Sequence, residues 1–196
     1  MFDSSVKARD LINAVKSEVD VACDIPNASY VLWLNALEQL LYGEFIKEQA
    51  RLEIKIDDNF NGCAELNGIR FEDIHAVFAG DVQLIKTTAL SGVIFPDSYY
   101  KTDNKLGVNL QNKHDKLTVI HFVRPELKTV DTADMVSDEN VMLPIEFIDL
   151  AMAKLRGEAY KVMNEDALAA KWLSDYNILI ENFRTWIQLK QPEFGM

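Results

Sequence analysis

The strongest constraint on the fold is a pair of segments near the end of the chain whose apolar residues recur at helical spacing. The first of these segments is LPIEFIDLAMAKLRGEAY, at residues 143–160. Pro144 suits the first helical position, where a missing backbone N–H loses no partner, and Glu146 and Asp149 favour the positive end of the helix dipole. Spacings of three and four then place six apolar residues on one face: Ile145, Ile148, Met152, Leu155, Ala159 and Val162. The segment predicts a helix with one buried stripe.

A second helix is predicted from about Glu165, directly after a break at Asn164. Because the connection is so short, the two helices should form an αα-hairpin that packs over a sheet or over an earlier helix. The inward positions of the second helix are expected to be Leu168, Trp172, Leu179, Phe183 and Trp186. The helical spacing of its aromatic residues favours a core over the alternative, a ligand pocket lined by Trp172, Tyr176, Phe183 and Trp186.

Two further helices are predicted at the start of the chain. The first covers about residues 4–21, with Ser4 or Ser5 as its cap. The second follows the segment CDIPNAS, with Asn27 or Ser29 as its cap. Its apolar residues again recur at spacings of three and four, which predicts a buried face made of Leu34, Leu37, Leu41 and Phe45.

The middle of the chain changes to the period of a β-strand. In RLEIKI, Leu52, Ile54 and Ile56 alternate with three charged residues. Further short strands are predicted in IHAVFAG, VQLIKTT, SYYK, KLGVNL and KLTVIHFV, with turns at Asn67-Gly68, Gly80-Asp81 and Asp103-Asn104. The polar segment 126–142, which carries five acidic residues against one lysine, is predicted to be a loop.

Together these elements predict an α+β fold with N-terminal helices, a small central antiparallel sheet or sandwich, and a C-terminal αα-hairpin. We expect a single domain over residues 1–196, because 196 residues suit one core. Its helical body would comprise residues 1–50 and 143–190, with a β insert at about 51–125 and a tail at 188–196. The edges of such short strands must be covered by helices or by neighbouring subunits, which hints at association.

Charge and composition exclude several classes of function. A formal net charge of -11 disfavours a nucleic-acid-binding surface, because phosphate affinity depends on clustered Lys and Arg. Cys23 and Cys63 are too few for a disulfide framework or a zinc site. The N-terminus has no signal-peptide pattern. The most apolar window, YVLWLNALEQLLYGEF, is interrupted by Asn35 and Glu38 and is too short to span a bilayer, so we expect no membrane association.

No catalytic, metal or cofactor-binding motif is found. His75, His114 and His121 lack a metal-ligand spacing, and no nucleophile elbow, P-loop or dinucleotide fingerprint is present. Paired carboxylates at Asp57-Asp58 and Glu72-Asp73 are better explained by solvated turns. We therefore expect no enzyme activity, no metal and no cofactor. A metal-dependent hydrolase remains an alternative, and it would require the histidines to converge with carboxylates.

Aromatic residues provide the candidate protein contacts. Tyr99 and Tyr100 lie beside a predicted hairpin tip in FPDSYYKTDNKLG, where they can supply both packing and hydrogen bonds to a partner. Trp186 and Phe194, near the C-terminus, complete the set of candidate interface residues.

The succession of these segments resembles the head-to-tail connector, or adaptor, proteins of tailed bacteriophages, including the tail-tube gatekeeper type. The resemblance lies in the order and spacing of WLNALEQLLYGEF, VFAGDVQLIKTT, SYYKTDNKLGVNL, LTVIHFVRPEL and LPIEFIDLAMAKLRGEAYKVMNEDALAAKW, and it covers most of the chain. It implies a structural virion protein, made in the host cytoplasm, that forms a ring of identical subunits, a dodecamer, at the head-tail interface.

The same resemblance implies partners and the absence of a catalytic site. The ring would dock beneath the portal protein, receive the tail tube or nozzle protein below, and let DNA pass without specific binding. The free subunit is expected to be monomeric in some members. Residues 188–196 would reach the portal, with Phe194 as the anchor. From the net charge of -11 we expect acidic side chains to line the channel, because they repel DNA phosphates. The alternative from another class is a soluble regulatory or protein-binding module of phage or bacterial origin.

Overall fold

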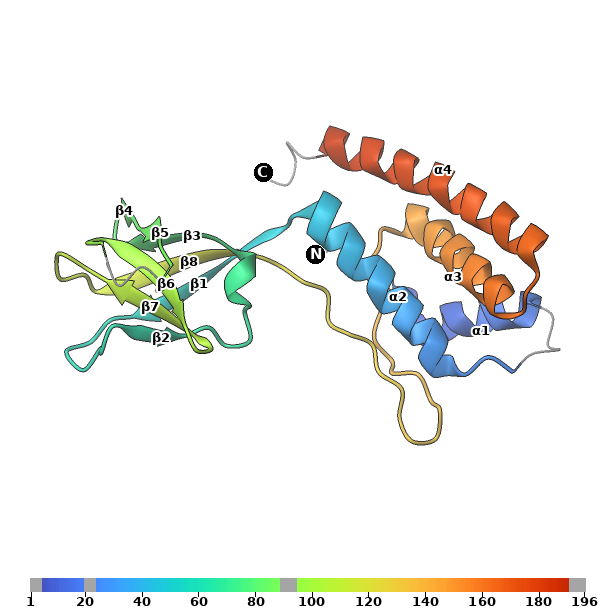
Figure 1. Cartoon of the computed structure of the whole chain (residues 1–196), viewed down its shortest axis with the longest axis horizontal. Coiled ribbons are helices and arrows are strands. Elements are labelled where there is room, and N and C mark those ends of the chain that lie inside the picture. Colours follow the sequence, from blue (N-terminus) through green and yellow to red (C-terminus); the bar gives the residue numbers. More distant parts are fainter. Residues whose placement is uncertain (1–4, 20–23, 89–94, 191–196) are drawn as a thin grey trace. The chain divides into compact units, whose positions relative to one another are not determined.

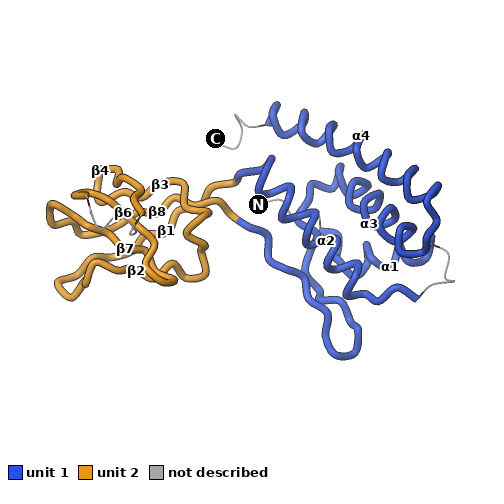
Figure 2. Tube along the Cα trace, in the orientation of Figure 1, with its two compact units in different colours: residues 1–47, 124–196 blue, residues 48–123 orange. Residues whose placement is uncertain are grey.

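A computed structural model describes residues 5–19, 24–88 and 95–190. The chain divides into two compact units, one made of residues 1–47 and 124–196 and the other of residues 48–123 (Figure 2). The first unit contains the helices and the second contains the strands (Figure 1). The predicted α+β class, with a helix pair at the C-terminal end, is confirmed.

The helical unit is built from both ends of the chain. Its elements are α1 (Ala8–Glu18), α2 (Asn27–Leu41), the π-helical turn η1 (Tyr42–Ile46), the 3-10 turn η4 (Ile145–Phe147), α3 (Ile148–Val162) and α4 (Asp166–Lys190). Helix α3 lies at the centre and packs against α1, α2 and α4. The predicted αα-hairpin of α3 and α4 therefore packs on an earlier helix, which is one of the two supports that the sequence left open.

The predicted helix caps are wrong. Helix α1 starts only at Ala8. The N-cap residue is Lys7 in α1 and Pro26 in α2, and neither makes a side-chain hydrogen bond to its helix. Contacts with distant segments replace them. The Ala8 N–H donates to the Glu139 carbonyl at 3.0 Å, and the Asn27 amide donates to the Asp134 carbonyl at 2.7 Å. Residues that are distant in the sequence therefore bind the starts of both helices, where nearby side chains were expected to cap them. Ser4, one of the predicted caps, lies outside the described residues.

The buried faces of α3 and α4 differ in part from the predicted stripes. Leu155, Ala159 and Phe183 are buried as expected. Ile145 is 57% exposed, because it belongs to the 3-10 turn before α3 and is out of phase with that helix. Val162 and Leu168, on either side of the hairpin turn, are also exposed. Because α3 is covered on several sides, its small residues Ala151, Ala153 and Gly157 are buried as well. Helix α4 also buries three residues that were not among its predicted inward positions: Ala169, Tyr176 and Ile187.

The β unit consists of two four-stranded sheets. One has the order β1 (Gln49–Lys55), β8 (Lys116–Phe122), β3 (Ile74–Ala79) and β4 (Val82–Gln83). The other has the order β2 (Cys63–Glu65), β7 (Lys105–Asn109), β6 (Ser98–Thr102) and β5 (Ile85–Lys86), and the 3-10 turn η2 (Phe71–Asp73) precedes β3. All pairings are antiparallel except that of β5 with β6, which is parallel.

The apolar residues of both sheets form one separate hydrophobic cluster, which includes Val77, Leu106, Leu117 and Val119. The alternation predicted for residues 51–56 is confirmed, because Leu52 and Ile54 pack against this cluster while the intervening charged residues are exposed. The three predicted turns are present, and Asn67, Gly80 and Asp103 adopt the left-handed backbone conformation that tight turns require. Strand β2 was not predicted, because three residues are too short for a periodic signal.

Candidate interaction surfaces

The predicted interface residues occupy three different environments. Tyr99 is only 3% exposed and packs in the β-unit core against Phe71, with ring centroids 5.9 Å apart. Burial raises the pKa of the Tyr99 hydroxyl. Tyr100 is half-buried and lies opposite Gly107 on β7. The tyrosine pair thus offers only Tyr100 to a partner.

Trp186 belongs to an aromatic group of the helical unit. Its ring lies 5.3 Å from Phe147 and 6.1 Å from Phe183, and Phe183 in turn contacts Phe45. Trp186 remains half-buried, so its outer edge is accessible. The predicted aromatic core of α4 is borne out by this packing. Phe194 lies outside the described residues.

The residues that a hydrolase would need do not gather into a metal-binding group. Over residues 5–19, 24–88 and 95–190, no three His, Cys, Asp or Glu side chains are close enough to hold a metal ion. His75 lies at a bulge in β3 with its ring 5.4 Å from Phe122, and His121 lies next to it on β8. His114 precedes the opposite end of β8.

The paired carboxylates have structural partners. Asp58 forms an ion pair with Lys113, and Asp57 accepts a hydrogen bond from the Asn59 N–H within its turn. Glu72 pairs with Lys101 at 2.8 Å, and the hydrogen bond from that lysine lowers the pKa of the carboxyl. The buried Asp73 pairs with Arg70 at 3.0 Å.

An open hollow of about 600 Å³ lies on the β unit, between β3, β4 and β5. It is lined by both apolar and polar side chains, among them His75, Ile85, Lys86 and Phe122. A second hollow of similar volume lies between the 65–72 segment and the β6–β7 hairpin. Both are partly open to solvent, which suits a contact with a protein surface better than the enclosure of a small molecule.

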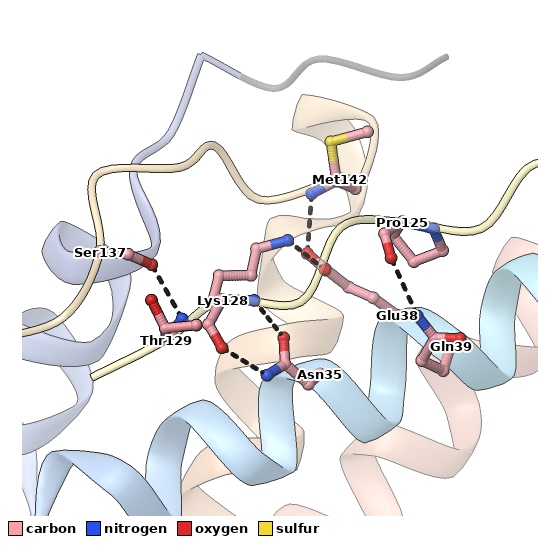
Figure 3. Close-up of polar contacts among 8 residues, drawn as sticks. All are labelled: Asn35, Glu38, Gln39, Pro125, Lys128, Thr129, Ser137 and Met142. Carbon is pink, nitrogen blue, oxygen red and sulfur yellow. Dashed lines mark hydrogen bonds and ion pairs between the residues drawn. The ribbon is translucent and has the colours of Figure 1, made fainter. Parts of the chain in front are cut away.

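The 125–142 segment, here called the strap, is bound to the polar side of α2 (Figure 3). The side-chain amide of Asn35 makes two hydrogen bonds to the backbone of Lys128, both at 2.9 Å. Its Nδ2 donates to the Lys128 carbonyl, and its Oδ1 accepts from the Lys128 N–H. One turn further, the Gln39 amide donates to the Pro125 carbonyl at 3.0 Å. The loop predicted at 126–142 is therefore irregular, as expected, yet fixed in place.

A buried ion pair completes the attachment of the strap. Lys128 donates to one oxygen of Glu38, and the other oxygen accepts the Met142 N–H at 2.8 Å (Figure 3). Both side chains are almost fully buried. Burial raises the pKa of Glu38, and the charge and hydrogen bond of Lys128 oppose that rise. Every partner is a residue of the strap, so the pair holds the fold and leaves no room for a substrate.

The side of α2 that faces neither α3 nor the strap is apolar and exposed. Positions one turn apart form the α2 row, which consists of Ala28, Leu32, Ala36 and Leu40. Leu32 is 66% exposed and Leu40 is 37% exposed. The single charged residue of α2 is Glu38, which is buried with the strap. Sequence analysis missed this row, although a 15-residue helix with one charge was a signal that both faces would be covered.

No described helix is both long enough and apolar enough to cross a bilayer. Comparison with known proteins found no matching family model and no matching curated protein.

Proposed function

We propose that this chain is a subunit of the head-to-tail connector of a tailed bacteriophage, forming a ring beneath the portal protein and carrying the tail tube or nozzle below. The observation that carries the proposal is the helical body built from both chain ends, with the β unit inserted between α2 and α3. This is the order of elements for which the sequence resembles the connector proteins.

Two features of the described residues support an assembly role. The exposed α2 row would be a liability on a protein that stays alone, since contiguous exposed apolar surface usually marks an interaction site. The net charge of -11 suits a channel through which DNA moves without adhering, because acidic side chains repel phosphates. In this proposal the DNA-facing surface of the ring is predominantly Asp and Glu.

The proposal is tested by mixing the purified full chain with the portal ring of the genome that encodes it. Negative-stain microscopy and native mass measurement should detect a ring of this chain bound to one end of the portal. A chain that stays monomeric or dimeric with and without the portal would contradict the proposal. A monomer in the absence of portal would not, because assembly on a template can supply the missing contact area.

A second candidate, a regulatory or protein-binding module, is favoured by the hollow beside His75, Ile85 and Phe122. Such a module would bind its partner through the β unit and would be indifferent to the portal. Capture of a defined peptide or protein that protects this hollow from chemical labelling, together with failure to bind portal, would support the module over the connector.

A further inference from the structure

The sheet formed by β1, β8, β3 and β4 has one face in the core of the β unit and one outer face. Residues that lie opposite each other on paired strands point to the same side of a sheet. The register of β1 with β8 therefore brings six side chains together on the outer sheet face: Arg51, Glu53, Lys55, Lys116, Thr118 and Ile120. Because Glu53 pairs with Lys116 at 2.8 Å, Arg51 and Lys55 leave these six residues with a net positive charge.

Apolar side chains lie beside these charges on the outer sheet face. Phe78 on β3 lies opposite Thr118, and Phe122 on β8 lies opposite Gln49. Phe78, Ile120 and Phe122 are half-buried, and none of them belongs to either hydrophobic cluster of the described residues. An apolar centre with charged residues at its rim is the usual anatomy of a protein–protein interface.

The helical unit has a surface of the opposite charge on the strap. The strap contains five acidic residues and one lysine, and that lysine, Lys128, is buried against Glu38. Residues 131–135, here called the strap tip, are all exposed and include two aspartates and Met135. Met135 is 54% exposed. The strap tip thus combines negative charge with an exposed and adaptable apolar side chain, which complements the outer sheet face in both respects.

The backbone of the strap tip is already fixed in a tight turn. Val130 and Val136 form a β-bridge at its base, and the Asp131 N–H donates to the Met135 carbonyl at 3.0 Å. The Asp131 Oδ1 accepts the N–H groups of Ala133 and Met135 at 2.8 and 2.9 Å. In Figure 1 the tip projects from the helices at the N-terminal end of α2. A projecting loop with a preformed backbone loses little conformational freedom when it binds.

We propose that the strap tip of one subunit binds the outer sheet face of a second copy of this chain, with Met135 over Ile120. The two aspartates of the tip then lie beside Arg51 and Lys55. Within one subunit the Asn27 amide holds the tip at the start of α2, whereas the β unit is joined beyond the end of α2, about 20 Å away along that helix. A second copy can therefore supply the sheet face.

The nature of the contact agrees with assembly of a ring on a template. The tip and the sheet face are two different surfaces of the same chain, so the contact is heterologous and can generate a closed ring. A five-residue tip covers much less than the roughly 800 Å² per partner that a stable pair buries. One such contact is weak, whereas a ring repeats it at every subunit. The inference rests on the proposed ring and names two surfaces that join its subunits.

Charge reversal tests the complementarity of the two surfaces. In the full chain, Arg51→Glu with Lys55→Glu gives the outer sheet face a negative charge. Thr132→Lys with Ala133→Lys and Asp134→Asn gives the strap tip a positive charge. All five positions are exposed, so both variants should keep the fold, which circular dichroism checks. Each variant should lower the yield of rings on the portal at least tenfold, because like charges then meet.

A combined chain and a control complete this test. The chain with both sets of changes has opposite charges in every contact again, so its ring yield should be at least threefold higher than that of either parent variant. The control Lys101→Glu, Lys105→Glu reverses two charges on the β6–β7 hairpin of the other sheet and should assemble as the wild type does. Either parent variant with the wild-type yield of rings, or a combined chain that recovers nothing, would overturn the proposal.

Cysteine crosslinking locates the contact. In a full-length Cys23→Ser, Cys63→Ser background, a Met135→Cys chain is mixed with an Arg51→Cys chain in the presence of portal, and a short bismaleimide is added. Joined dimers should form at least tenfold more efficiently than with the control pair Met135→Cys and Lys105→Cys, because Lys105 is exposed on the other sheet.

The crosslinking outcomes separate this contact from the ring itself. Rings without joining of the Met135→Cys and Arg51→Cys chains overturn the inference and leave the connector function standing. Efficient joining without closed rings supports the contact and contradicts the connector. A single chain with both cysteines that crosslinks within itself at high dilution would show that the tip binds its own β unit, which overturns the proposal. Protection of the cysteine at position 51 by portal or DNA alone, with no joined dimers, would assign the face to that partner and also overturn it.

Discussion

Leu173 on α4 occupies the space that a side chain on Gly157 of α3 would need. A Cβ at Gly157 would lie 2.8 Å from both Cγ and Cδ2 of Leu173. The two helices of the hairpin approach this closely because α3 presents glycine at the crossing point. The close packing of the two C-terminal helices therefore requires glycine at position 157, because any side chain there would collide with Leu173.

Gly157→Ala should destabilise the chain. Alanine gains about 1 kcal/mol in helix propensity, but overpacking of a tight contact typically costs about 1–3 kcal/mol. We expect a net loss of about 1 kcal/mol in the free energy of unfolding, measured by urea denaturation. Gly43→Ala is the matched control, because its Cβ would meet only the flexible tip of Arg124. A Gly157→Ala protein as stable as Gly43→Ala would contradict the close approach.

The Glu38–Lys128 pair should show strong coupling. Removal of either partner leaves the other charge buried without a counter-ion, so Glu38→Leu and Lys128→Met should each lose about 3–5 kcal/mol of stability. The double variant Glu38→Leu, Lys128→Met should lose less than either single change, because it buries no charge. A double-mutant cycle by denaturation measures this, and additive losses would show that the two side chains do not interact.

The stability of the strap should depend on pH through Glu38. Burial raises the pKa of this carboxyl in the folded chain, despite the opposing effect of Lys128. The folded state then binds the proton more readily, so the contribution of Glu38 to stability is fully present below its unfolded pKa and is lost as pH rises through the folded value. Relative to Glu38→Gln, the wild type should gain stability as pH falls across that window. A difference that shrinks on acidification would contradict the raised pKa.

The two adjacent tyrosines should behave differently. Tyr99→Ser removes a buried ring and should cost about 3–5 kcal/mol of stability, as large-to-small core changes do. Tyr100→Ser changes a half-buried ring over Gly107 and should retain more stability. Thermal unfolding of both variants, followed by ring assembly of Tyr100→Ser, separates a core role from a contact role. Equal destabilisation would show that the ring of Tyr100 contributes as much to the core as that of Tyr99.

The hydrophobic period was enough to predict the helix pair, α2 and most strands, because each of these elements has at least one buried apolar face. The hydrophobic period did not predict the burial of residues that are covered by a segment distant in the sequence. Asn35 and Glu38 looked like interruptions of an apolar helix, and only the fold shows that they bind the strap and the buried Lys128. Helix ends were mispredicted for the same reason, since Glu139 and Asp134 are distant in sequence from the helices that they hold.

The candidate surface was equally hard to find from sequence. Leu32 and Ala36 resemble core residues until the position of α3 shows which side of α2 is already filled. Tyr99 was selected for a surface because it lies beside a hairpin, yet strand alternation turns its ring inward and leaves only Tyr100 half-exposed. The signal that remains readable in sequence is the scarcity of charge along α2.

The most direct test of the connector function is the mass of the complex formed by the full chain and its portal ring. The proposal predicts a discrete species in which a closed ring of this chain, matching the symmetry of the portal, is added to one portal ring. A portal mass that is unchanged after incubation, with this chain recovered as a monomer or dimer, would contradict it.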